Sequence, residues 1–173
     1  MAYRHLLGII VVAAGLAFPL HAEAQELADS LVVTVTDSNE LRNALVLGHH
    51  AEATPDFDFP LRESPVPPVP IDQVFDVRFF DPPGYPRKPS TGAYRDIRGI
   101  TTADVDTFVV HCQPMNDGYP MRVKWNPALA YVQYSEAEIR TADGSKLVCD
   151  MRSTHEIMLE GREQSRFLII IRR

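Results

Sequence analysis

The sequence predicts an all-β protein, an Ig-like antiparallel β-sandwich with a proline-rich crossover. Apolar residues recur at every second position in short runs along the chain, which is the period of a half-buried strand. The spacing of an amphipathic helix never extends beyond one turn. Turn-forming residues separate the runs every 8–12 residues or so, as in sandwiches and barrels. A sandwich is favoured because the runs differ in length and long irregular connections interrupt them.

The first two strands are predicted to form a hairpin. Residues 30–36 (SLVVTVT) alternate and are rich in β-branched side chains, which favour strands. The Asp-Ser-Asn sequence at 37–39 is typical of a turn. Residues 41–47 are then the returning strand, and Gly48 closes it.

Six further runs alternate in the same way. An Asp-Gly dipeptide at 143–144 predicts a tight hairpin between two of them. Trp125 falls on the inward phase of its run, so we expect it to pack in the core. The residues predicted to point inward are Phe75, Val77 and Phe79; Phe108, Val110 and Cys112; Met121, Val123 and Trp125; Ala137, Ile139 and Thr141; Leu147, Cys149 and Met151; and Phe167, Ile169 and Ile171.

Residues 1–24 have the three parts of a secretory signal peptide. Arg4 and His5 give a positive start, an apolar stretch of 15 residues follows, and small residues at 22 and 24 suit cleavage before Gln25. The apolar stretch is short of the ~20 residues that span a bilayer, although an uncleaved anchor is the alternative. We therefore predict a signal peptide at 1–24, a single β-sandwich domain at 25–173 and no membrane span after cleavage. The location expected is secreted or cell surface.

The composition narrows the class of protein. The chain has 173 residues, 45% of them hydrophobic and 23% charged, as in ordinary globular domains. Its net charge of −6 argues against nucleic-acid partners, because binding to the phosphate backbone needs a basic surface. Two cysteines are too few for a disulfide-dense miniprotein or a four-cysteine zinc site.

Ten prolines lie between residues 55 and 89. Proline cannot donate to a strand ladder, so no central strand is expected there. The sequence SPVPPVP at 64–70 predicts an extended polyproline II segment. We favour a stiff crossover between the two sheets, with a docking ligand for an aromatic groove as the alternative. Asp76 and Arg78, which follow this segment, fall on the solvent phase of their strand and are expected to be surface charges.

Cys112 and Cys149 both fall on inward phases. In an oxidising compartment they are expected to form one disulfide, with two buried thiols as the alternative. A catalytic cysteine is disfavoured, because His111 points to the opposite face of the same strand.

No catalytic motif is found. The chain lacks a nucleophile elbow, a zinc-protease motif, a phosphate-binding loop and a dinucleotide fingerprint. The spacing of His49, His50 and the acidic residues that follow them matches no standard metal loop. We therefore expect a solvated loop there, and we expect the protein to bind neither a metal nor a cofactor. Four aromatic rings could in principle stack on a sugar: those of Tyr119, Trp125, Tyr131 and Tyr134. This interpretation is disfavoured because the rings fall on different faces.

Several segments together resemble a secreted β-sandwich module of Bacteroidetes-like multidomain surface proteins. They are VTVTD at 33–37, ATPDFD at 53–58, the acidic-proline stretch at 63–70, FDVRF at 75–79, YRDIRG at 94–99 and VKWNP at 123–127. The resemblance covers residues 31–171 and implies a β-sandwich without an assigned activity. Because no sorting domain follows Arg173, a periplasmic location is the alternative to secretion.

These observations predict an exported, non-enzymatic module for protein binding, adhesion or surface assembly. A protein partner or a cell-surface component is expected. The distinctive loop at Asp56, Phe57 and Asp58 is the predicted binding site, because irregular loops on a rigid sheet carry most binding function. The alternatives are a carbohydrate-binding module and, less favoured, a small secreted hydrolase.

Overall fold

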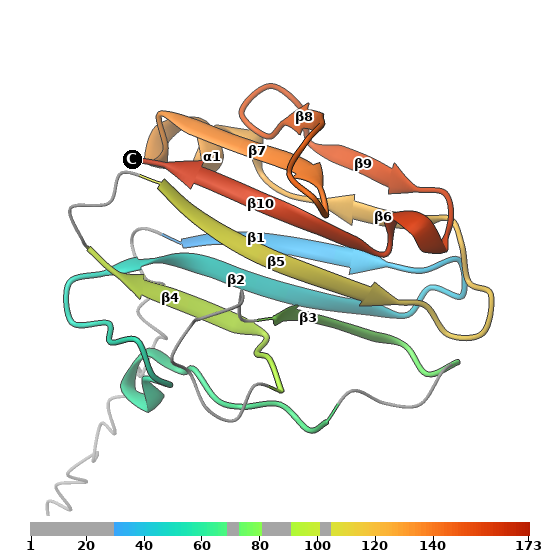
Figure 1. The fold of residues 1–173 in the computed structure, drawn as a ribbon, viewed down its shortest axis with the longest axis horizontal. Coiled ribbons are helices and arrows are strands. Elements are labelled where there is room, and N and C mark those ends of the chain that lie inside the picture. The colour runs from blue at the N-terminus through green and yellow to red at the C-terminus, as the bar shows by residue number, and fades with distance from the viewer. Residues whose placement is uncertain (1–29, 69–72, 81–90, 101–104) are drawn as a thin grey trace, which may run out of the picture.

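A computed structural model describes residues 30–68, 73–80, 91–100 and 105–173. Ten strands in these residues form two five-stranded sheets. Sheet A has the order β4 (Arg95–Gly99), β2 (Arg42–His50), β1 (Ser30–Thr36), β6 (Met121–Lys124) and β9 (Glu156–Leu159). Sheet B has the order β3 (Asp76–Phe80), β5 (Val105–Gln113), β10 (Arg166–Arg172), β7 (Glu136–Thr141) and β8 (Leu147–Asp150). The predicted all-β sandwich is confirmed (Figure 1).

The sheets are mostly antiparallel. The first predicted hairpin is β1 and β2, which pair in register from Ser30 opposite Gly48 to Thr36 opposite Arg42. Within the described residues only β2 and β4 run parallel. A parallel neighbour needs a long connection, and here the proline-rich region together with β3 supplies it.

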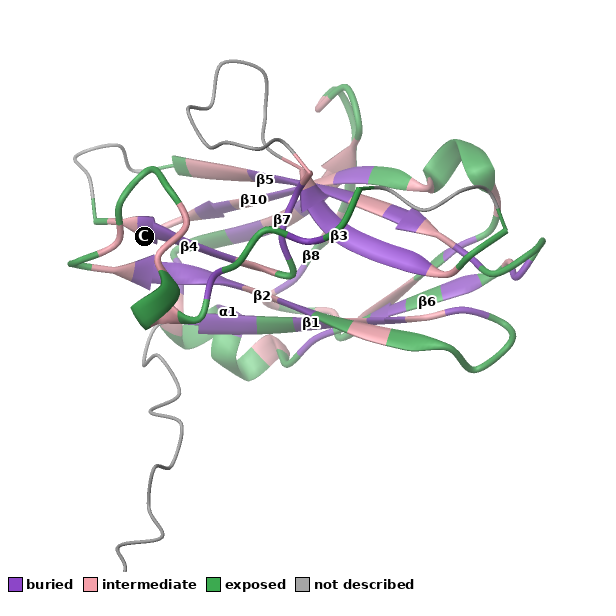
Figure 2. Ribbon diagram, turned by 90° about the horizontal axis from the view of Figure 1, so that it is seen from below, coloured by how far each residue is buried: buried purple, intermediate pink, exposed green. Residues whose placement is uncertain are grey.

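The core lies between the two inward faces (Figure 2). The alternating residues predicted to point inward supply most of it, including Phe108, Ile139 and Ile169, which are fully buried. Trp125 is also in this core, as predicted, and its indole N–H donates a 2.8 Å hydrogen bond to the Met151 carbonyl. Each fully buried large apolar side chain contributes about 1.5–3 kcal/mol, so this face-to-face packing is the main source of stability.

A short helix, α1 (Pro127–Gln133), lies at one end of the sandwich near the C-terminus (Figure 1). Its cap is the Asn126 side chain, which accepts a hydrogen bond from the Ala128 amide, and Pro127 occupies the first turn. Both are common helix-start signals. The period-two pattern of the sequence does not predict this helix.

The proline-rich region crosses between the sheets, joining β2 of sheet A to β3 of sheet B. Its C-terminal described part is tied down at the β3 edge. The Val66 amide donates to the Gly92 carbonyl, and Ala93 pairs with Phe79 through two backbone hydrogen bonds. Gly92 has φ +86°, and a Cβ there would lie 2.2 Å from the Phe79 carbonyl oxygen, so only glycine fits. The prolines at 70, 82, 83, 86 and 89 lie outside the described residues.

The prediction that Asp76 and Arg78 are surface charges is wrong. Arg78 is 1% exposed and Asp76 4% exposed. Arg78 donates two hydrogen bonds to the Asp76 carboxylate, at 2.6 and 2.7 Å, and two more to the carbonyls of Pro67 and Thr91. Both side chains do leave β3 on its outward face, but the chain around Pro67 and Thr91 covers them.

The predicted disulfide is also wrong, since both cysteines are free thiols. Cys112 lies on β5 and Cys149 on β8, and β10 and β7 separate these strands. Three strand spacings amount to roughly 14 Å. The register also offsets Cys112 along β5 by four residues from Phe108, the β5 residue in line with Cys149. A disulfide requires Cα atoms within about 7 Å, and the order of strands in a sheet cannot be read from hydropathy.

No helix in the described residues has the length and apolar character needed to cross a bilayer. The predicted signal peptide at 1–24 lies outside the described residues.

Candidate functional site

The predicted binding residues lie in a loop after β2 that is organised by its own carboxylates. Asp58 accepts hydrogen bonds from the amide and the hydroxyl of Thr54, at 2.6 and 3.0 Å. Asp56 accepts one from the Phe57 amide at 2.9 Å. Side-chain bonds of this kind from aspartate fix a turn without a ladder. Asp56 and Asp58 therefore shape the loop.

Glu63 anchors this loop to sheet A. Its carboxylate is fully buried and accepts hydrogen bonds from the Asp58 amide at 3.0 Å and from the Ile97 amide of β4 at 2.6 Å. β4 is an edge strand, so the Glu63 carboxylate takes a position that a neighbouring strand would otherwise fill. The buried Glu63 thus fixes the loop and occupies part of the edge of β4 that could pair with another strand.

The loop holds its aromatic residues out of the main core. Phe59, in the single turn η1 (Phe59–Leu61), is 71% exposed, and Phe57 is partly buried. Neither belongs to the main hydrophobic cluster. Tyr85, a further aromatic residue of the proline-rich region, lies outside the described residues. Figure 1 shows η1 beyond the β4 edge, on the side of the sandwich opposite β8 and β9.

A network of charges lies between the sheets near the end of β2. His49 of β2 contacts Asp106 of β5 at 2.7 Å, and Arg98 of β4 bridges Asp106 and Asp96 at 3.4 and 3.1 Å. Burial alone would raise the pKa of Asp106, but the hydrogen bond from His49 and the charge of Arg98 outweigh it and hold the pKa below its usual value. Arg98 also covers the ring of Phe108 at 3.9 Å. This network joins β2, β4 and β5.

The histidine and acidic residues weighed as metal ligands do not converge. His49 is buried against Asp106, His50 accepts a hydrogen bond from the Glu52 amide, and Asp58 is bonded to Thr54. Within the described residues no cluster of three or more His, Cys, Asp or Glu is arranged for a metal ion.

The four rings weighed for sugar stacking do not form one exposed face. Trp125 and Tyr134 are buried at 7% and 3% exposure. Tyr131 is exposed, and the guanidinium of Arg152 lies 4.7 Å from its ring centre.

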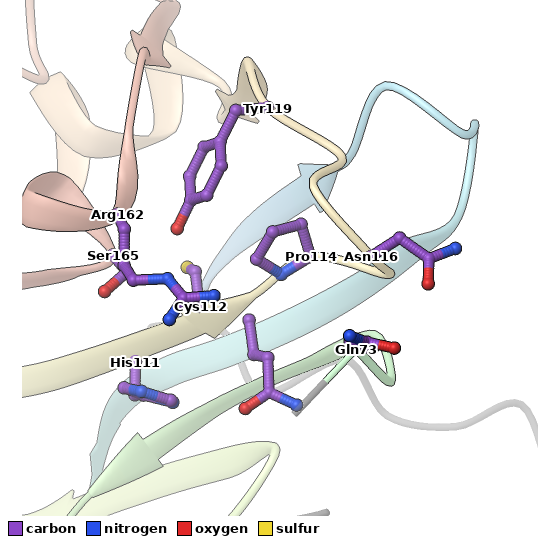
Figure 3. Close-up of a pocket in the computed structure, with 9 residues that line it drawn as sticks. Gln73, His111, Cys112, Pro114, Asn116, Tyr119, Arg162 and Ser165 are labelled. Atoms are coloured by element: carbon purple, nitrogen blue, oxygen red, sulfur yellow. The ribbon is translucent and has the colours of Figure 1, made fainter. Parts of the chain in front are cut away.

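A polar pocket of about 230 Å³ opens at the end of sheet B, between the end of β5 and the start of β10. Figure 3 shows Tyr119 directing its hydroxyl toward the side where Arg162 and Ser165 lie. His111 and Cys112 also line it, although they leave β5 on opposite faces. Burial raises the pKa of the Cys112 thiol, which keeps it protonated and poorly nucleophilic.

Among the described residues, no histidine ring is hydrogen-bonded to a serine, threonine or cysteine side chain. That contact is the usual mark of an activated nucleophile.

The sequence pattern singled out the loop as a prediction, but it did not indicate that Glu63 organises the loop or that Arg162 lies at the pocket. Both carry charge, and a charged residue gives no hydropathy signal for burial or for a pocket. The local clue that the sequence did offer is Thr54, four residues before Asp58, whose hydrogen bonds to the Asp58 carboxylate shape the loop.

Comparison with family models, with curated proteins and with solved structures finds no match for this chain. The resemblance to a Bacteroidetes-like surface module therefore stays a prediction.

Proposed function

We propose that this protein is an exported, non-enzymatic module that binds another protein through the loop at residues 54–63. A partner on the cell surface or in the envelope suits the predicted signal peptide, with the periplasm as the alternative location. Asp56, Phe57, Asp58 and Phe59 belong to this surface, and the buried Glu63 anchors it.

The observation that carries the proposal is the exposure of Phe59 on an anchored loop. A large aromatic side chain left 71% exposed is an energetic cost for the free protein that a partner would remove. The hydrogen bonds from the Asp58 and Ile97 amides to Glu63 hold the loop in one shape, so little conformational entropy is lost on binding. Aromatic residues on rigid supports are the usual anchors of protein interfaces.

Two observations favour binding over hydrolysis. The thiol of Cys112 is buried and held protonated, and no nucleophile–histidine contact occurs in the described part of the chain. A sugar platform built from Trp125 and Tyr134 is disfavoured because both rings are buried.

The test is affinity capture from the envelope fraction of the source organism with purified wild-type protein. Phe59→Asp replaces the exposed ring with a charge and is expected to lose the captured partner. Val132→Asp, at an α1 side chain that is 80% exposed, is the matched control and should retain it. The proposal fails if capture is the same with both variants, provided that circular dichroism shows both to be folded.

A further inference from the structure

We propose that the pocket between β5 and β10 binds a small oxyanion, the phosphate or carboxylate group of a ligand, with Arg162 as its main contact. The site is separate from the protein-binding loop. It takes its shape from the ends of both strands, from the connection between β5 and β6, and from the turn η2 (Arg162–Gln164).

Each polar side chain that lines the pocket can donate a hydrogen bond, although those of Ser165 and Tyr119 already bond to each other. Arg162, Tyr119, Ser165, Asn116 and His111 supply a guanidinium, two hydroxyls, an amide and an imidazole. No aspartate or glutamate is among its described lining residues. In a chain with net charge −6, a pocket without carboxylates is a local exception that favours an anion.

Two of these groups lack partners. In the described residues the Arg162 guanidinium makes no ion pair and no hydrogen bond. The Nδ1 atom of His111 is buried and also has none. A planar guanidinium matches phosphate and carboxylate oxygens with two parallel hydrogen bonds, so an oxyanion would satisfy the strongest unused donor at the pocket.

The surroundings of the pocket add positive charge. The register places Arg78 and Arg166 on either side of His111, across β3, β5 and β10. Arg166 is exposed, while Arg78 is neutralised by Asp76. Two acidic groups also lie near the pocket: Glu163 acts on Tyr119, and Asp37 accepts a hydrogen bond from the Met115 amide, next to Asn116.

The ionisation of the lining residues agrees with this assignment. Burial lowers the pKa of His111; Asp76 opposes this shift, while Arg166 and Arg78 add to it. Burial raises the pKa of Tyr119, so its hydroxyl remains a donor. An anion beside His111 would raise the pKa of that histidine and draw a proton into the pocket.

The volume suits a small group. About 230 Å³ is well above the roughly 30 Å³ that one water occupies in the liquid. The pocket therefore has room for a phosphate or carboxylate and a few further atoms, and a larger ligand would extend into solvent.

The experiment is an NMR titration of the wild-type protein, the Arg162→Gln variant and the Arg122→Gln variant with inorganic phosphate and, separately, with acetate. Ionic strength is held constant with sodium chloride. Arg162 and Arg122 are both exposed, so neither change should disturb folding, and Arg122 lies on β6 in the other sheet.

We expect saturable shifts of the His111 imidazole and the Ser165 amide, weakened about tenfold or more by Arg162→Gln and less than about twofold by Arg122→Gln. Saturation by phosphate alone would assign a phosphate group, and saturation by acetate would assign a carboxylate. Shifts that are linear in both anions, or that Arg162→Gln leaves unchanged, would overturn the proposal.

Discussion

Removing both members of the buried Asp76–Arg78 pair should cost much less stability than the two single removals added together. Arg78 is 1% exposed and uses four hydrogen bonds, two to Asp76 and one each to the Pro67 and Thr91 carbonyls. Asp76→Ala leaves the guanidinium buried with only two neutral acceptors. Breaking a buried pair in this way costs about 3–5 kcal/mol. Arg78→Met leaves a buried carboxylate instead, with a cost of the same order.

The double variant Asp76→Ala/Arg78→Met leaves no uncompensated charge. Its main cost is that the Pro67 and Thr91 carbonyls lose their hydrogen-bond donor. The stability lost in the double variant should therefore be well below the sum of the losses in the two single variants. Urea unfolding followed by circular dichroism gives the three free energies of unfolding, and we expect a coupling of about 2 kcal/mol or more. Additive effects within about 0.5 kcal/mol would refute the reasoning that the pair is buried and interdependent.

Three further predictions concern the core, the pocket and the thiols. Trp125→Phe leaves the Met151 carbonyl without its donor and should lower the free energy of unfolding in urea by about 1–3 kcal/mol; an unchanged midpoint would contradict this. Because burial lowers the pKa of His111, the unfolded state binds its proton more readily, so stability falls as pH drops below about 6.5. His111→Gln should reduce this loss between pH 7 and 5, and an equal loss would count against it. Purified protein should show the intact-thiol mass, with Cys149, whose pKa burial raises to about 11, reacting with a thiol reagent before Cys112; a mass 2 Da lower would contradict it.

The sequence predicted those strands whose inward face carries an apolar residue at every second position. β1, β5, β7 and β10 follow this rule, and their alternation matches the buried positions. β4 was missed because the rule is reversed there. Its charged residues Asp96 and Arg98 point inward, where they pair with each other and with Asp106, and Ile97 points outward beneath the Glu63 loop.

The errors have a common physical cause. Alternating hydropathy shows which residues point into the core when one face of a strand is buried, but it does not show which segments cover the opposite face. Arg78 is buried because the segments around Pro67 and Thr91 cover it, and the cysteines are apart because two strands lie between theirs. Both features depend on the tertiary structure, which hydropathy along the chain does not contain.

The unusual composition singled out the candidate loop, but it did not indicate which residues hold the loop in place. Asp56 and Asp58 were predicted as binding residues, yet their carboxylates accept hydrogen bonds from Thr54 and Phe57 of the same loop. Phe59 is the side chain that this arrangement presents to solvent.

A photo-crosslinking amino acid at position 59, introduced into the protein in its own organism, tests the protein-binding surface most directly. The same probe at position 132 on α1 gives the background for a residue of similar exposure. We predict one discrete protein adduct from position 59 that is missing from position 132. No adduct from position 59, or the same set of adducts from both positions, would contradict a protein-binding role for this loop.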